Sequence, residues 1–508
     1  MNKVIITIFM LALVLRFLYF PGNIYFGFDQ ARDAYEALDI INGDLKIIGP
    51  TTSFVGLNHG VLYYYILAPL YFLGNHSPEF VAAAWRIFNA VGIFIIFYLT
   101  SILFNKRAAI ITAIFFAVSF EQTQFAIFLH HPSLGVLSTL VMYLGLALVI
   151  FKKNSYGLPL AVLGLGLSIQ FEFPLIYLVV PFLLLVVIFY KHFINLSRKI
   201  IIISLAVFIT SVSTFILVEI KNNFRTINSL IALSGFNPDK SVSSIVNTYL
   251  YTVTKMVSFN IVGDWFSAQI ILFALFGVYS WFIFKKVHQK QLIFLGIWFV
   301  GIFATFIVNG GSSDLERNVP LYYPTVGASV SLLILFAFVV ERLSRKNVFL
   351  GFILIAFIIC ANLLQITKLN SKGTILELTV QQGMILSDEK QVIDFIYKNS
   401  NNQPYAVKAV TMPFDINTTW SYLFEWYGKD KYGYLPIWGG KNASGYHGNL
   451  IVEGAQDKLP NIRYVIIEPT RGIRLGLIDD FLRIEDYFTN IIKEEKIGQF
   501  VVQKREKY

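Results

Sequence analysis

Charged residues are scarce in this chain. Asp, Glu, Lys and Arg make up 14% of its 508 residues, whereas hydrophobic residues make up 56%. A soluble globular protein carries about 25% charged residues, so the composition excludes an ordinary soluble protein and predicts a polytopic α-helical membrane protein. The net charge of +10 indicates no nucleic-acid partner, because the Lys and Arg lie between apolar segments and not in one patch.

Cysteine is almost absent. The single cysteine, Cys360, lies inside an apolar run, which excludes a disulfide within the chain and a cysteine metal site. The sequence also lacks a glycine-rich loop that would cradle a nucleotide phosphate. The first apolar segment has no clear small-residue cleavage site, so we interpret it as a retained membrane anchor and not as a signal peptide.

Long apolar runs dominate instead. A membrane-spanning helix needs about 20 mostly apolar residues, and this criterion predicts about eleven spans. They lie near residues 3–21, 84–104, 108–128, 133–151, 157–171, 173–190, 200–219, 266–284, 292–309, 320–341 and 348–366. An odd number of spans puts the two ends of the chain on opposite sides of the membrane.

Clusters of positive charge predict the orientation of these spans. Five short loops carry them, and the span order puts all five on one side of the membrane. They contain Lys106-Arg107, Lys152-Lys153, Lys191 to Lys199, Lys285 to Lys290 and Arg342 to Lys346. Basic loops stay in the cytoplasm, so we expect a protein of the plasma or inner membrane with a cytoplasmic N-terminus. Residues 1–366 then form the membrane domain and residues 367–508 a soluble extracytoplasmic domain.

The tail from residue 367 has ordinary soluble composition. Ser387 precedes Asp388-Glu389 and a set of apolar residues at helical spacing, which is typical of a capped amphipathic helix. Residues 405–412, 463–467 and 499–503 have the composition of strands. We therefore predict a small α/β domain on the outer face.

The outer loop after the first span carries the first candidate site. Within residues 22–83 we predict two amphipathic helices along the membrane interface, at residues 29–42 and 62–73. Asp29, Arg32 and Asp33 have the i, i+3, i+4 spacing that puts all three on one helical face. A weakly solvated carboxylate is a natural general base for a hydroxyl. The alternative is that Asp29 only caps the helix, with Arg32 and Asp33 as solvated neighbours.

Polar residues also gather at the outer ends of later spans. Ionisable residues at this depth usually mark a functional cavity, although residues at the end of a span can simply reach the headgroups. The outer candidates are Glu121, Gln122, Gln124, His130 and His131; Gln170 and Glu172; Glu219, Asn222, Asn223 and Arg225; and Asp314, Glu316, Arg317, Asn318 and Tyr323. Because all of them point to one side of the membrane, they predict a cavity open to the outside.

A metal site has little support in the sequence. His130 and His131 are adjacent, so on a helix their side chains diverge by about 100° and cannot easily share one metal ion. His59 could join one of them, but no recognisable ligand spacing demands it. A divalent metal is therefore a minor alternative, and no cofactor is firmly expected.

In the order and spacing of its polar outer residues, the chain resembles the polyprenyl-phosphate-dependent glycosyltransferases of the GT-C fold, such as the protein O-mannosyltransferases and the lipid A aminoarabinose transferases. The resemblance covers residues 1–366 and is strongest over residues 25–104. These enzymes carry an acidic residue after the first span, typically in Asp-Glu-x-Arg-Tyr. The match to Asp29 implies that this residue is the catalytic base, with Gln30 in place of the usual Glu.

Further segments carry the resemblance, with departures. The second family segment, Glu-Lys-Pro-Pro-Leu, reads Asn58-His59-Gly60-Val61-Leu62 here, so His59 replaces the lysine that would approach the lipid phosphate. Arg86 matches an arginine at the start of the second span, and Tyr323 belongs to a late outer-loop motif. Where the family often has an acidic residue after the third span, this chain has His130-His131.

The resemblance implies an inverting transfer of a sugar from a polyprenyl-phosphate donor in the membrane to a hydroxyl of a lipid, glycan or protein. Asp29 would deprotonate that hydroxyl. Cations would stabilise the leaving phosphate; in falling order the candidates are Arg32, Arg317, Arg225 and His59. Two alternatives stay open. One is a transporter or lipid flippase with discontinuous helices near Gln170, and the other is an enzyme that ligates or polymerises whole glycans from a lipid-linked oligosaccharide.

Overall fold

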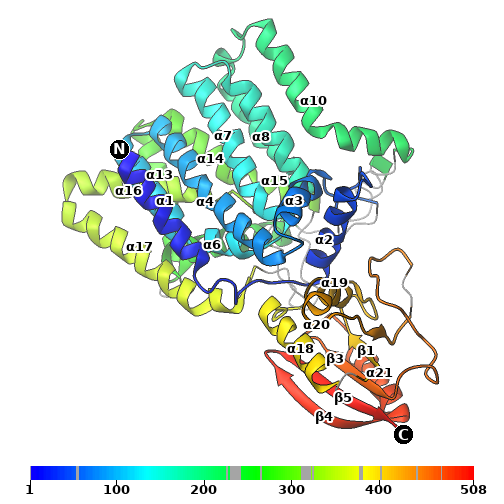
Figure 1. The fold of residues 1–508 in the computed structure, drawn as a ribbon. Coiled ribbons are helices and arrows are strands. Elements are labelled where there is room, and N and C mark those ends of the chain that lie inside the picture. The colour runs from blue at the N-terminus through cyan, green and yellow to red at the C-terminus, as the bar shows by residue number, and fades with distance from the viewer. Residues whose placement is uncertain are drawn as a thin grey trace.

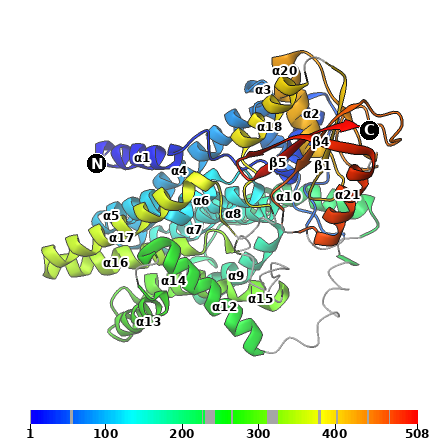
Figure 2. The same ribbon diagram turned by 90° about the horizontal axis from the view of Figure 1, so that it is seen from below.

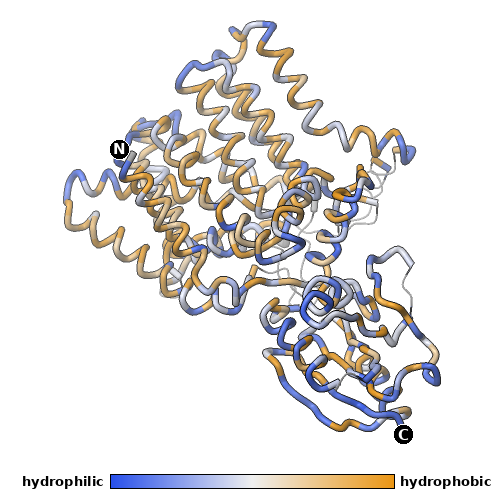
Figure 3. The backbone as a smooth tube through the Cα atoms, in the orientation of Figure 1, coloured by the Kyte–Doolittle hydropathy of each residue, from blue (hydrophilic) through white to orange (hydrophobic). Residues whose placement is uncertain are grey.

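The structure is a computed structural model that describes residues 2–52, 56–224, 227–228, 242–263, 266–309, 322, 325–376, 381–400, 403–441, 444–470 and 472–508. Over these residues the chain forms a bundle of helices and a smaller α/β unit made by the C-terminal tail (Figure 1). The bundle helices are hydrophobic along most of their length and hydrophilic at their turns, whereas the tail mixes both kinds of residue (Figure 3).

The bundle helices form where the sequence is apolar, because a helix satisfies its own backbone hydrogen bonds inside a membrane. They are α1 (Asn2–Phe17), α4 (Pro78–Leu103), α5 (Lys106–Val118), α6 (Phe120–Ile127), α7 (Gly135–Lys152), α8 (Gly157–Phe171), α9 (Val179–Ile188), α10 (Arg198–Lys221), α12 (Val242–Val257), α13 (Ala268–Phe284), α14 (Gln289–Gly301), α15 (Phe303–Asn309), α16 (Ser329–Lys346) and α17 (Val348–Leu369). Short 3₁₀ turns precede α7 and α9, at His131–Leu134 and Phe173–Leu178. Among the described residues, five helical segments are long and apolar enough to cross a membrane, or six if α5 and α6 count as one bent span. The protein is therefore a polytopic helical membrane protein.

Three parts of the bundle differ from the prediction. The third predicted span breaks at Ser119, whose hydroxyl oxygen accepts a bond from the backbone N–H of Gln122 (3.1 Å) and starts α6 at 52° to α5. Helix α12 lies in a stretch predicted as an outer loop; apolar residues recur there at helical spacing, but over too short a length for a span. Helix α16 begins at Ser329, later than the predicted span.

Helices α7 and α8 pack closely through small residues. A Cβ added to Gly145 would lie 2.4 Å from the backbone nitrogen of Ala161, and one added to Gly164 would lie 2.3 Å from that of Met142. Such close approach of two backbones is the usual way in which small residues join membrane helices. The pair matters for the site because α8 ends at Phe171, directly before Glu172.

The loop after α1 contains the two predicted helices, α2 (Phe28–Ile41) and α3 (Leu62–Leu73). Helix α2 is capped at Gly27, whose backbone N–H donates to the side-chain oxygen of Gln30 (3.1 Å). The alternative that Asp29 caps this helix is therefore wrong, since Asp29 lies in its first turn. The Gln30 amide also donates to the carbonyl of Leu129 (3.0 Å). A glutamate could not make this bond when ionised, so Gln30 fastens the start of α2 to the segment that follows α6.

The elements of the tail are α18 (Leu386–Asn399), β1 (Tyr405–Val410), α19 (Thr418–Leu423), a π-turn (Phe424–Gly428), α20 (Lys429–Tyr432), β2 (Ile437–Trp438), β3 (Ile462–Ile467), α21 (Leu475–Phe488), β4 (Thr489–Ile497) and β5 (Phe500–Lys507). The strands form a five-stranded mixed sheet in the order β2-β1-β3-β5-β4. Strand β1 is parallel to β2 and β3, whereas β5 is antiparallel to β3 and β4. Helix α18 starts at Leu386 without a side-chain cap, so the predicted Ser387 cap is wrong. The sequence did not predict the edge strand β4, because exposed charged residues occupy both of its faces.

The tail lies against α2 at one end of the bundle, as two views show (Figures 1 and 2). The backbone N–H of Phe26 donates to the carbonyl of Met384 (3.1 Å), and that of Leu386 donates to Ile24 (2.9 Å). The Tyr422 hydroxyl donates to the carbonyl of His76 (2.6 Å). These bonds fix the tail beside the helix that carries Asp29.

Candidate active site

The first two turns of α2 hold the three predicted charges. The Arg32 guanidinium lies 2.7 Å from the Asp29 carboxylate and 2.7 Å from the Asp33 carboxylate. The helical spacing therefore brings the three residues together as the sequence predicts. Their exposure differs, because the Asp29 side chain is 49% exposed and that of Asp33 only 1%. Asp29 is therefore accessible to a substrate, whereas Asp33 is buried and forms an ion pair with Arg32.

The two carboxylates have opposite pKa perturbations. Partial burial acts to raise the pKa of Asp29, but the Arg32 guanidinium and the nearby His130 outweigh it and hold that pKa well below its ordinary value. Burial raises the pKa of Asp33 despite its pairing with Arg32. Asp29 is therefore ionised at neutral pH, which is the state that a general base requires.

His130 is a second partner of Asp29, and the sequence did not predict this contact. Its Nε2 lies 3.7 Å from an Asp29 carboxylate oxygen. The expectation that His130 and His131 diverge on a helix is wrong, because the chain leaves α6 at Ile127 and His130 is extended. The rings of His130 and His131 instead lie 4.0 Å apart. No sequence pattern marks His130 as this partner, because its approach depends on the tertiary bond between Gln30 and Leu129.

A buried cluster lies behind His130. The ring of His59 is 4.0 Å from that of His131, and the Nδ1 atoms of His59 and His131 lie 3.7 Å and 3.1 Å from the Glu172 carboxylate. Glu172 is fully buried, and neither of its carboxylate oxygens accepts a hydrogen bond from any described residue. The fold brings these three predicted residues together from separate segments of the chain.

This cluster can hold a divalent metal. One ligand atom from each of His59, His131 and Glu172 lies within 4.8 Å of the others, and two imidazoles with a carboxylate form a donor set that suits zinc. The orphaned oxygens of Glu172 fit a cation. Both Nδ1 atoms already bond backbone groups, since His131 contacts the carbonyl of Phe171 (2.7 Å) and His59 accepts from Phe173 (3.1 Å). A metal would therefore bind the Nε2 atoms or displace those bonds. The ligands are far apart along the chain, so their spacing could not reveal the group.

His59 cannot act as the predicted phosphate cation while it is buried. Burial, together with the charges of His130 and Arg32, lowers its pKa to about 3. The imidazole is therefore neutral at physiological pH. The ranking of His59 among the cations is wrong for this reason.

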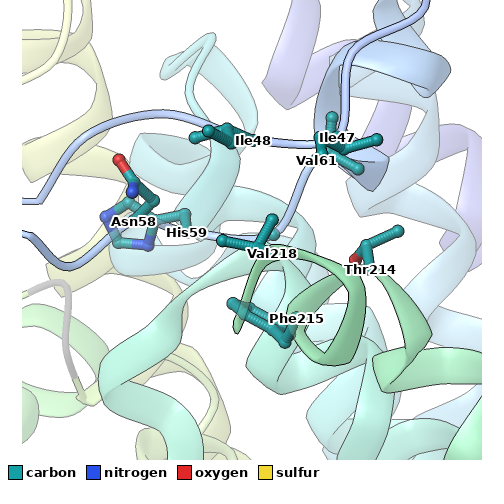
Figure 4. A pocket seen from close by; sticks show the side chains of 9 residues that line it. Ile47, Ile48, Asn58, His59, Val61, Thr214, Phe215 and Val218 are labelled. Atoms are coloured by element: carbon teal, nitrogen blue, oxygen red, sulfur yellow. The ribbon is translucent and has the colours of Figure 1, made fainter. Parts of the chain in front are cut away.

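Asn58 and Gln170 border the cluster. Asn58 and His59 line a small cavity with Thr214, Phe215 and Val218 of α10 (Figure 4). The Gln170 side-chain amide donates to the carbonyl of Ser211 (2.9 Å) and to the Thr214 hydroxyl (2.8 Å), and its backbone carbonyl accepts from Gly60 (2.8 Å). Gln170 therefore positions the loop of His59 against α10.

The remaining predicted residues either lie away from this site or are outside the described residues. Arg86 lies buried inside α4 and not at the start of the span. Its guanidinium donates to the carbonyls of Arg16 (3.0 Å) and Ala82 (2.9 Å) and to the Asn23 side chain (2.9 Å), so it is a structural residue. Arg225, Arg317 and Tyr323 are outside the described residues.

Another buried carboxylate, Glu121, belongs to a polar network within the bundle. The side-chain amide of Asn260 donates to it (2.9 Å), and so do the hydroxyls of Tyr322 and Ser329. The sequence marks Glu121 as polar at membrane depth, but its partners come from three later segments. Their convergence follows from the packing of the bundle.

Comparisons with known proteins agree with this architecture. Residues 58–217 match the family model described as dolichyl-phosphate-mannose-protein mannosyltransferase. The fold is similar to that of ArnT from Cupriavidus metallidurans bound to undecaprenyl phosphate, with 12% identity, a TM-score of 0.62 and coverage of 98% of this chain and 97% of ArnT. The chain has the GT-C fold. The apo state of the same ArnT matches with 11% identity, a TM-score of 0.62 and coverage of 99% and 98%. A search of curated protein sequences found no match.

Within this GT-C fold, the likeness extends across the tail as well as the helical bundle, because the ArnT match covers nearly the whole chain. At 12% identity it establishes the fold and not the chemistry. Asp29 lies in the first turn of α2, where its half-exposed carboxylate is accessible.

Proposed function

We propose that this protein is a membrane glycosyltransferase that transfers a sugar from a polyprenyl-phosphate donor to an acceptor hydroxyl, with inversion at the anomeric carbon and Asp29 as the general base. The observation that carries the proposal is the half-exposed, ionised Asp29 carboxylate on α2, held by Arg32 and His130. The GT-C fold supports the glycosyltransferase class. The matched family model and the ArnT complex name dolichyl phosphate and undecaprenyl phosphate, which supports a lipid-phosphate donor.

In the proposed reaction Asp29 accepts the proton of the acceptor hydroxyl as its oxygen attacks the anomeric carbon. The bond from that carbon to the phosphate oxygen breaks, and its electron pair leaves with the phosphate. Arg32 aligns Asp29 and is already compensated by two carboxylates, so it orients the base more than it binds phosphate. Arg317 and Arg225 stay the proposed phosphate partners.

We further propose that the chain crosses the plasma or inner membrane about eleven times, with its N-terminus in the cytoplasm and residues 367–508 outside. The turns between α7 and α8 and between α16 and α17 lie at one end of the bundle with the N-terminus, and the tail lies beyond the other end (Figures 1 and 2). Both turns carry basic residues, which supports a cytoplasmic side.

The test compares the full-length protein with Asp29→Asn in liposomes that contain radiolabelled polyprenyl-phosphate sugars. We expect Asp29→Asn to lower donor turnover by about 10² to 10⁴-fold, the usual worth of a general base. Asp44→Asn is the matched control, because Asp44 is a 69% exposed carboxylate beyond the end of α2. Full activity of Asp29→Asn would refute the base assignment. Movement of the donor across the bilayer without turnover would instead indicate a flippase, and transfer only from a lipid-linked oligosaccharide would indicate a glycan ligase.

A further inference from the structure

A loop of the tail, residues 444–449, lies directly beside the first turns of α2. The ring of Tyr446 is 5.9 Å from that of Phe28, in an edge-on arrangement. The His447 ring stacks on Tyr35 at 5.4 Å, and its Nε2 lies 3.1 Å from Glu36. The tail therefore contributes side chains to the surroundings of Asp29, although more than four hundred residues separate them.

Several bonds hold this loop in place. The Thr418 hydroxyl donates to the carbonyl of His447 (2.6 Å), and the backbone and side-chain N–H groups of Asn449 donate to Glu425 (3.1 and 3.0 Å). The Tyr35 hydroxyl of α2 donates to the same Glu425 carboxylate (2.8 Å). One carboxylate thus joins the loop to α2, which sets the position of Tyr446 relative to Asp29.

The contact leaves an open aromatic surface next to the base. Tyr446 is 48% exposed, and the Asp29 carboxylate is 49% exposed. The Arg32 guanidinium, which bonds Asp29, lies 5.9 Å from the centre of the Phe28 ring. Phe28 therefore borders the Asp29–Arg32 pair, and Tyr446 lies beside Phe28. We call Phe28 and Tyr446 the aromatic platform.

The charges around the platform indicate what it binds. Among the described residues, Arg32 is paired with Asp29 and Asp33, and Glu36 is paired with Lys46 (3.2 Å) and His447. These groups carry more negative than positive charge, because Lys46 is also shared with Asp39 and Asp44, so they disfavour a phosphorylated or other anionic ligand. A sugar ring fits instead, because its C–H face packs on aromatic rings while its hydroxyls reach polar groups.

We propose that the aromatic platform is the acceptor subsite and that the acceptor is a neutral glycan. This inference rests on the proposed glycosyltransferase function and adds its acceptor class. A sugar ring on Phe28 and Tyr446 presents one hydroxyl to Asp29, which takes the proton, while the hydroxyl oxygen forms the new bond to the donor's anomeric carbon and the phosphate leaves with the broken bond's electrons. The tail supplies one wall of the acceptor site.

The test measures transfer by the full-length protein in liposomes to mannobiose, galactobiose and a Ser/Thr-rich peptide, with hydrolysis of the donor measured alongside. Tyr446→Ala is expected to raise the KM for a disaccharide about tenfold, which is the upper worth of one aromatic contact, with a smaller change in kcat. Tyr446→Phe keeps the ring and is expected to restore the KM. Tyr487→Ala is the control, because Tyr487 is 77% exposed on α21.

Each outcome decides the proposal. A raised KM in Tyr446→Ala, rescued by Tyr446→Phe, supports it. Transfer to disaccharides with the same KM in wild type and Tyr446→Ala overturns the subsite and leaves the glycosyltransferase function intact. Transfer to the peptide alone overturns the glycan assignment. Absence of donor turnover by the wild type with every acceptor and with water contradicts the glycosyltransferase function itself, and the acceptor subsite falls with it.

Discussion

The substitution Arg32→Met tests the charge arrangement on which the site depends. Arg32 bonds Asp29 and Asp33, each at 2.7 Å. Asp33 is 1% exposed, and its Oδ2 has no hydrogen-bond partner among the described residues. Methionine keeps most of the length of the side chain and its apolar contacts, so the variant removes the positive charge and leaves a buried carboxylate alone.

The expected loss of stability follows from the burial of the Arg32–Asp33 pair. Removing one partner of a buried ion pair typically destabilises a protein by about 3–5 kcal/mol. Arg32 is 15% exposed, so we expect a loss of about 3 kcal/mol at pH 7 from Asp33. The half-exposed Asp29 pair adds no more than about 1 kcal/mol. Burial already raises the pKa of Asp33, and the loss of Arg32 raises that pKa further. The loss of stability in Arg32→Met therefore becomes smaller as the pH falls and Asp33 becomes protonated.

The assay is thermal unfolding of the full-length protein in detergent, as a double-mutant cycle of Arg32→Met, Asp33→Asn and both together. We expect Arg32→Met to unfold at a lower temperature than the wild type at pH 7 and to approach it at pH 5. The double variant should be more stable than Arg32→Met alone, since the unpaired charge is gone. Equal stability of Arg32→Met and wild type at pH 7, or no recovery in the double variant, would refute the reasoning.

The same variant has a consequence for activity. Without Arg32, the pKa of Asp29 moves up from its depressed position because the strongest opposing charge is lost. Transfer should therefore fall at a higher pH in Arg32→Met than in the wild type when the pH is lowered. The measurement is kcat/KM for donor turnover from pH 4 to pH 8, and identical acid limbs would contradict the role of Arg32 as the tuner of Asp29.

Two further predictions concern stability. Burial raises the pKa of Glu468 from 4.5 to about 8, although the Trp420 indole donates a hydrogen bond to it (2.8 Å). This carboxyl therefore contributes to stability at low pH, and the contribution is lost as pH rises from about 4.5 to about 8. Glu468→Gln should flatten this decline in stability, which unfolding followed by tryptophan fluorescence at pH 5 and pH 8 would detect. Gly145→Ala should lower the unfolding temperature by forcing α7 from α8, at a cost of about 1–3 kcal/mol. Gly277→Ala in α13 has nothing within 4 Å of its added Cβ and should be neutral or slightly stabilising, and equal effects of the two substitutions would contradict the packing argument.

Sequence alone determined the local architecture. Apolar runs predict most of the bundle helices, although not α12, because hydrophobic length and periodicity are properties of neighbouring residues. The same holds for α2 and α3, whose ends are within one residue of the prediction. The i, i+3, i+4 spacing also determined that Asp29, Arg32 and Asp33 lie together, since helical geometry depends on no distant contact. Cap positions were less predictable, as Gly27 and Ile385 show, because several nearby residues can start a helix.

Only the tertiary structure decided what surrounds Asp29. The approach of His130 depends on the Gln30–Leu129 bond and on the extended segment after α6, and the break at Ser119 depends on its contacts with other helices, such as the bond to Asn260 (2.6 Å). His59, His131 and Glu172 meet because three separate segments pack together, and Tyr446 reaches Phe28 because the tail docks on α2. Contacts between residues so far apart leave no periodic trace in the sequence, since packing and not spacing sets them.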